Sequence, residues 1–113
     1  MEIKLNYIEK GEGIPLVLLH GNGENSEYFS EQINYFSPYF RVIAVDTRGH
    51  GKSPRGTKSF TIEQFADDLK DFLDEMKLKD IYLLGFSDGA NTALLFTIKF
   101  PGYVKKLVLD APN

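Results

Sequence analysis

Short aliphatic runs that lack the apolar–polar alternation of a half-exposed strand recur along the chain. They are Leu16–Leu19, Val42–Val45, Ile81–Leu84 and Leu107–Leu109. Such runs are typical of strands that are buried on both faces of a parallel sheet. A further segment, Ile3–Ile8, does alternate, and it predicts a half-buried strand that ends at the turn Gly11-Glu12-Gly13. The chain therefore favours a sheet built mainly from parallel strands.

Helical patterns separate these runs. Thr61–Met76 carries an apolar stripe at helical spacing, and Thr61 and Gln64 have the spacing of a capping box. Ser26–Phe36 and Asp88–Phe100 also have helical patterns, and the second of these is apolar on most sides. The order of strands and helices predicts an α/β fold with a mostly parallel sheet, flanking helices and right-handed crossovers.

Composition excludes several classes of function. The net charge is −3 without a basic stripe, so we expect no nucleic-acid partner. The chain has no cysteine, and its two histidines, His20 and His50, are too few for a histidine-based metal site unless carboxylates contribute. No metal or organic cofactor is implied by the sequence. No apolar run approaches the roughly 18 residues of a membrane span, and the N-terminus lacks a signal-peptide layout. We therefore expect a cytoplasmic protein that does not associate with a membrane.

The segment Gly85-Phe86-Ser87-Asp88-Gly89 has a G-x-S-x-G pattern between a predicted strand and a predicted helix. A tight turn at this place tolerates only small flanking residues, and it presents the serine hydroxyl at the N-terminus of the helix. Unpaired N–H groups and the helix dipole favour a developing oxyanion there. The alternative is an ordinary serine whose side chain caps the helix.

Two further motifs accompany the serine turn. Pro15–Gly23 is a predicted strand that ends in His-Gly, and Arg41–Ser53 is another that ends in D-x-R-G-H-G-x-S. In this order and spacing, the three motifs resemble the N-terminal half of the α/β-hydrolase superfamily of serine hydrolases, from about Ile3 to Asn113. The resemblance implies a non-metal hydrolase that cleaves an ester, thioester or amide of a small molecule through an acyl-Ser87 intermediate.

The resemblance also implies roles for individual residues. The backbone N–H groups of Asn22 and Asp88 would form the oxyanion hole, with Gly23 a less favoured donor than Asn22. The two histidines would be structural. The side chain of Asp88 is either a solvated carboxylate that interacts with the helix dipole or a substrate-binding group that pairs with a cation such as an amine. Asp110, at the end of the last predicted strand, is a weak candidate for the catalytic acid.

In this fold the triad follows the order serine, acid, histidine, and no histidine follows Ser87. We therefore expect residues 1–113 to form the N-terminal part of a single α/β-hydrolase domain. The acid and the histidine base would come from a missing C-terminal segment or from a second chain that associates with this one. Two alternatives stay open: a catalytically incompetent fragment or binding module, and a non-hydrolytic enzyme of the same fold that performs carbon–carbon cleavage, lyase or perhydrolase chemistry.

Overall fold

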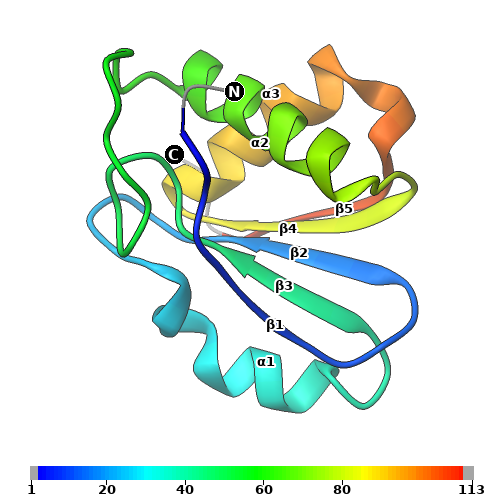
Figure 1. Ribbon diagram of the computed structural model, residues 1–113. Helices are drawn as coiled ribbons and strands as arrows, with labels where there is room; N and C mark the ends of the chain where they lie inside the picture. The colour runs from blue at the N-terminus through cyan, green and yellow to red at the C-terminus, as the bar shows by residue number, and fades with distance from the viewer. Residues whose placement is uncertain (1–2, 111–113) are drawn as a thin grey trace.

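A five-stranded sheet with helices on both faces forms the centre of the protein, which a computed structural model describes over residues 3–110 (Figure 1). The spatial order is β1-β3-β2-β4-β5, in which β1 runs antiparallel to β3 and all other neighbours are parallel. The strands are β1 (Tyr7–Lys10), β2 (Pro15–Leu19), β3 (Arg41–Val45), β4 (Ile81–Phe86) and β5 (Val104–Asp110). All four non-alternating runs lie in parallel strands, which confirms the predicted α/β fold class.

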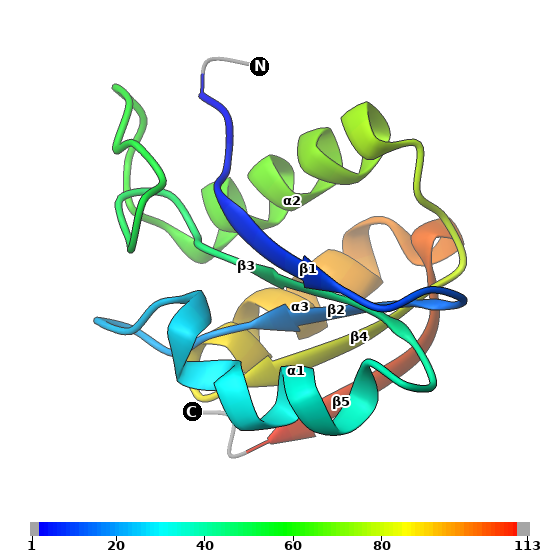
Figure 2. The same cartoon turned by 60° about the horizontal axis from the view of Figure 1, so that its bottom comes forward.

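Helices α2 (Ile62–Met76) and α3 (Asp88–Lys99) cover one face of the sheet, and α1 (Ser30–Phe36) covers part of the other (Figure 2). Two short 3₁₀ helices, η1 (Ser26–Phe29) and η2 (Pro101–Tyr103), precede α1 and β5. The segment predicted as one helix over 26–36 is thus a 3₁₀ turn followed by an α-helix. None of the helices within residues 3–110 is long and apolar enough to span a lipid bilayer.

The first strand lies later in the chain than its alternating pattern predicts. Its ladder pairs Tyr7 with Val45 and Lys10 with Val42, so the pairing begins where β3 ends. Ile3 and Leu5 are nevertheless buried, because they pack as irregular chain in the core beneath α2. The alternation predicted the burial of Ile3 and Leu5, but Tyr7 on the same side of the pattern is exposed. The extent of β3 determines which residues form a strand.

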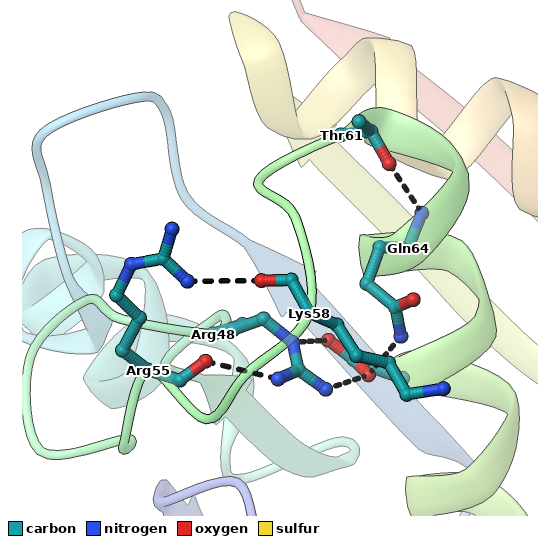
Figure 3. A network of polar contacts seen from close by, with 6 residues as sticks. Arg48, Arg55, Lys58, Thr61 and Gln64 are labelled. Carbon is teal, nitrogen blue, oxygen red and sulfur yellow. Dashed lines mark hydrogen bonds and ion pairs between the residues drawn. The ribbon is translucent and has the colours of Figure 1, made fainter.

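The start of α2 confirms half of the predicted capping box. The Thr61 side chain accepts a hydrogen bond from the Gln64 N–H at 3.0 Å, which satisfies one of the N–H groups that lack a partner within the helix (Figure 3). The Gln64 side chain does not return to Thr61 but donates to Asp68 Oδ1 at 2.8 Å. The capping residue therefore begins the helix as predicted, while its expected partner has another role.

The two central strands anchor the core. Val17 and Ile43 face α2 and α3, and Leu18 and Ala44 face α1, all with no solvent-exposed surface. Burial of apolar side chains on both faces of β2 and β3 holds these strands rigidly. The carboxyl ends of β2, β3 and β4 lie at the same edge of the sheet, and the loops that follow them carry the motifs described above.

Candidate active site

Ser87 occupies a strained turn between β4 and α3. Its backbone has φ 57° and ψ −119°, a conformation that non-glycine residues rarely adopt. The flanking glycines are required for space: a Cβ at Gly85 would lie 2.3 Å from the Gly89 carbonyl oxygen, and one at Gly89 would lie 2.3 Å from the Leu19 carbonyl oxygen. The Ser87 side chain makes no capping hydrogen bond to the helix, so the capping alternative is wrong.

Backbone hydrogen bonds hold the turn to the neighbouring strand. The Ser87 N–H donates to the Asp110 carbonyl oxygen at 2.9 Å, and the Ser87 carbonyl accepts from the Ala90 N–H at 2.9 Å. Asp110 is paired with Phe86 at the end of β5, and its side chain is exposed. The structure therefore brings Asp110 beside the turn through its backbone.

The loop after β2 packs against Ser87. A Cβ at Gly21 would lie 3.2 Å from the Ser87 Cβ, which shows how closely the two segments approach. The Gly21 N–H donates to Glu24 Oε1 at 3.1 Å, and the Glu24 N–H returns to the Gly21 carbonyl at 3.2 Å. Within residues 3–110, no acceptor meets the N–H of the next residue, Asn22. Asn22 and the first residue of α3, Asp88, both border the cavity beside the turn.

His20 is held at both ring nitrogens. Its Nε2 accepts a hydrogen bond from the Thr47 N–H at 3.1 Å, and its Nδ1 lies 2.7 Å from the Gly21 carbonyl oxygen. An N–H can only donate and a carbonyl can only accept, so the pattern requires a neutral imidazole protonated at Nδ1. Since neither nitrogen is left for the Ser87 hydroxyl, the role of His20 here is to tie the β2 loop to the β3 loop.

Burial lowers the pKa of His20 below its ordinary value of 6.5, although the hydrogen bond to Gly21 acts in the opposite direction. The unfolded chain therefore binds a proton near pH 6.5 that the folded chain takes up only at lower pH, so stability falls as pH decreases below about 6.5. We expect urea denaturation between pH 8 and 5 to show this decline, and the variant His20→Gln to flatten it. If the stability of His20→Gln fell equally between pH 8 and 5, the pH dependence would come from a titratable group other than His20.

Asp46 organises the start of the loop after β3. Its carboxylate accepts hydrogen bonds from the N–H of Ser26 at 2.7 Å, the N–H of Lys52 at 3.0 Å and the Asn6 amide at 2.9 Å. Burial acts to raise the pKa of Asp46, but these hydrogen bonds outweigh it and hold the pKa below 3.8. Asp46 therefore stays ionised and joins the chain before β1, the loop before α1 and its own loop.

A buried ion pair connects the same loop to α2. Arg48 Nε and Nη2 donate to the two carboxylate oxygens of Asp68, each at 2.8 Å, and the side chains are 1% and 4% exposed. The third donor, Nη1, meets the Arg55 carbonyl at 2.9 Å, and Arg55 in turn donates to the Lys58 carbonyl (Figure 3). The sequence analysis missed this network. Its signal was a carboxylate within the apolar stripe of α2, three residues after Phe65.

The network shapes the loop that carries His50 and Phe60. The His50 Nδ1 lies 3.0 Å from the Arg48 carbonyl, and its ring stacks on Phe60 with centroids 5.9 Å apart. The Arg55 guanidinium lies over the Phe60 ring, 4.2 Å from its centroid. A Cβ at Gly49 would lie 2.1 Å from the edge of the same ring. Phe60 is thus held from several sides although 45% of its surface is exposed.

A cavity of about 230 Å³ lies beside the serine turn. Its apolar wall is formed by Phe60, Ile62 and Phe65, and its polar wall includes Asn22 and Asp88. Two of the predicted site positions, Asn22 and Asp88, thus line one cavity, and Ser87 directly precedes Asp88 in the chain. No cluster of metal-ligating side chains occurs within residues 3–110.

Comparison with known proteins places this chain among hydrolases of one fold family. Residues 14–113 match the family described as the alpha/beta hydrolase fold. The serine hydrolase BPHL of Homo sapiens is 39% identical over an alignment that covers 98% of this chain and 40% of the relative. The (E)-2-((N-methylformamido)methylene)succinate hydrolase of Acinetobacter baylyi is 34% identical, with 92% of this chain and 40% of the relative covered.

A solved structure extends the likeness to three dimensions. The thermophilic esterase of Thermogutta terrifontis superposes with a TM-score of 0.93 and 31% identity, over 98% of this chain and 41% of that protein. The chain spans about 40% of the length of the curated relatives cited above. The likeness therefore covers the turn at Ser87 and the two loops beside it, and a larger part of each relative lies outside it.

Proposed function

Because the chain belongs to the α/β-hydrolase family, we propose that it is the nucleophile-bearing part of a hydrolase that cleaves an ester, thioester or amide. The Ser87 oxygen attacks the substrate carbonyl carbon while a base takes the hydroxyl proton, and the leaving group departs with a proton as the acyl-Ser87 intermediate forms. Water then releases the acid. The observation that carries this proposal is the strained turn at Ser87, set against the loop at Gly21 and beside a cavity.

The tetrahedral oxyanion would be held by the backbone N–H groups of Asn22 and Asp88. Both residues border the cavity, and they approach it from two different loops. Donors fixed on the carboxyl ends of β2 and β4 need little reorganisation when negative charge develops. The Gly21 N–H is unsuited to this role because Glu24 already accepts its hydrogen bond.

The base is proposed to come from outside this chain. His20 uses both ring nitrogens in other hydrogen bonds, and the His50 Nδ1 faces the Arg48 carbonyl. A C-terminal segment or a second chain would supply a histidine and an acid, in keeping with the share of the relatives that this chain leaves uncovered. Asp110, beside the turn at the end of β5, is a weaker candidate for the acid.

The Asp88 carboxylate is proposed to favour substrates that carry a cationic amine. It borders the cavity directly after the nucleophile, within reach of a group on the substrate. Neutralising it as Asp88→Asn removes the charge and keeps the backbone N–H. We expect the variant to lose its preference for amino esters over neutral esters of equal size, measured as a ratio of kcat/KM values. An unchanged ratio would contradict the proposed pairing with a cation and favour the alternative in which the Asp88 carboxylate interacts with the helix dipole.

A fluorophosphonate probe tests the proposal as a whole. The purified protein is incubated with the probe, and the intact mass of every polypeptide in the sample is recorded. A single adduct on this chain, absent in Ser87→Ala and retained in the surface variant Ser37→Ala, is expected when the completing histidine is present. A folded chain that stays unmodified in the presence of that segment would contradict the proposal and favour a scaffold or binding module.

A further inference from the structure

Thr92 stands out among the residues that line the cavity. It lies one helical turn after Asp88, is only 3% exposed, and contacts the same cavity as Asn22 and Asp88. No hydrogen bond to its hydroxyl is present within residues 3–110. The Thr92 Oγ1 is nevertheless not one of the fully enclosed polar atoms that lack a partner, so it can be reached from the cavity. A threonine hydroxyl that is open to a cavity can donate or accept a hydrogen bond with a ligand.

A second threonine on the same helix, Thr97, shows how the hydrogen bonding of Thr92 differs from the usual pattern. Thr97 satisfies its hydroxyl in the common helical manner, by donating to the carbonyl of Ala93 at 2.8 Å. Thr92 could make the equivalent bond to the carbonyl four residues earlier, yet that bond is not formed. Because side chains of a helix lean towards its N-terminus, the Thr92 side chain lies over the turn that contains Asp88 and Gly89.

We propose that the Thr92 hydroxyl binds a neutral hydrogen-bonding group on the substrate's acyl chain, a hydroxyl or a keto oxygen. A threonine hydroxyl can both donate and accept, so either group fits it. A negatively charged substituent would be repelled by the Asp88 carboxylate one turn away, and a cation would pair with that carboxylate instead. The inference rests on the proposed function in that it takes this cavity as the substrate's.

The remaining walls define the size and position of the acyl group. Phe60, Ile62 and Phe65 form an apolar surface opposite the polar wall. The cavity of about 230 Å³ is smaller than the usual 300–1,000 Å³ or so of pockets for larger ligands, so it suits a short chain. The leaving group must lie near the base, and the proposed base comes from outside this chain. The acyl group is therefore the part that enters the cavity, with its polar substituent a few bonds from the carbonyl.

The proposal is tested by replacing a hydroxyl with a methyl group of similar size, both on the ligand and on the protein. The full chain carries Ser87→Ala throughout, so esters are bound and not consumed, and the result does not depend on whether Ser87 is a nucleophile. The probes are methyl 3-hydroxybutanoate against methyl 3-methylbutanoate, and methyl 4-hydroxypentanoate against methyl 4-methylpentanoate. In each pair a methyl group replaces the hydroxyl. Kd is measured from the shifts of backbone amide NMR signals at Asp88 and Gly89.

We expect one hydroxy ester to bind about fivefold tighter than its methyl partner, the ratio that one net hydrogen bond supplies. Thr92→Val, which has the same shape, should remove this preference, whereas Thr97→Val should retain it. Thermal unfolding should show Thr92→Val close to the parent in stability, since the substitution keeps the side-chain shape and breaks no hydrogen bond within residues 3–110.

Two results would overturn the inference. One is a preference for the hydroxy ester that survives Thr92→Val, and the other is the absence of cavity shifts with all four esters. Failure of fluorophosphonate labelling in the presence of the segment that supplies the histidine, together with Thr92-dependent binding, would instead refute serine catalysis and leave this subsite intact.

Discussion

Replacing Arg48 with methionine while Asp68 stays in place is expected to lower the free energy of unfolding by about 3–5 kcal/mol. The guanidinium donates to both carboxylate oxygens, and the two side chains are almost fully buried. Without it, Asp68 keeps the hydrogen bond from Gln64 but has no compensating charge. Since whole domains are stable by only about 5–15 kcal/mol, a loss of this size is a large share. Urea denaturation at pH 7 measures it.

The double variant Arg48→Met with Asp68→Leu separates charge from packing. Removing both charges leaves no uncompensated carboxylate, so much of the lost stability should return. Lys99 and Asp67 form a matched control, because their ion pair joins α3 to α2 with both side chains more than 40% exposed. Lys99→Met should change stability little, as exposed pairs do. Equal losses in Arg48→Met and Lys99→Met would contradict the assigned role of burial.

The Arg48 substitution should also affect the site. The guanidinium holds the Arg55 carbonyl, and Arg55 lies over the Phe60 ring that walls the cavity. Loosening this loop would change the cavity without touching Ser87. A ligand that fits the wild-type cavity should bind more weakly in the variant, even where the fold persists.

Replacing Gly89 with alanine is the second large expected effect. The new Cβ would lie 2.3 Å from the Leu19 carbonyl oxygen and 2.5 Å from that of His20. These are backbone atoms of a central strand and its loop, so they cannot move aside as a flexible side chain would. Alanine normally stabilises a helix by about 1 kcal/mol relative to glycine. The clash is expected to outweigh this gain and to lower stability by about 2 kcal/mol or more in net terms.

Gly102→Ala provides the control for this substitution. Gly102 has no heavy atom within 4 Å of where its Cβ would be, so the same chemical change should leave the melting temperature nearly unchanged. Thermal unfolding followed by circular dichroism compares the two variants directly. A Gly89→Ala protein as stable as Gly102→Ala would show that α3 can withdraw from β2, and the close approach at the serine turn would lose its importance.

Local patterns in the sequence account for much of the fold. The aliphatic runs lie in buried strands, the stripe over 61–76 is α2 with Thr61 as its cap, and the glycine-flanked Ser87 occupies a strained turn. Each of these features depends on interactions between residues that lie close together in the sequence, so a local sequence pattern is enough to predict it. The alternating segment at the N-terminus failed in part, because a strand also needs a partner of matching extent, here β3.

The candidate site divides in the same way. The identity of Ser87 and the neighbouring glycines followed from the motif, and so did the expectation that Asn22 and Asp88 approach one place. The reason His20 is unsuited to act as the base did not follow from sequence, since it depends on Thr47 and Gly21 meeting its two nitrogens. Phe60 and Thr92 carried no motif at all, and only the packing of their segments places them on one cavity.

By itself, then, the sequence determined most helices and strands of this protein, the serine turn and the family's motifs. These features depend on steric contacts and burial patterns among residues that are close together in the chain. The tertiary structure alone decided the strand order, the Arg48–Asp68 pair and the cavity, in which no residue of 3–110 hydrogen-bonds to the Thr92 hydroxyl. These depend on segments tens of residues apart in the chain. Their contacts form only when the sheet brings the carboxyl ends of β2, β3 and β4 together at one edge.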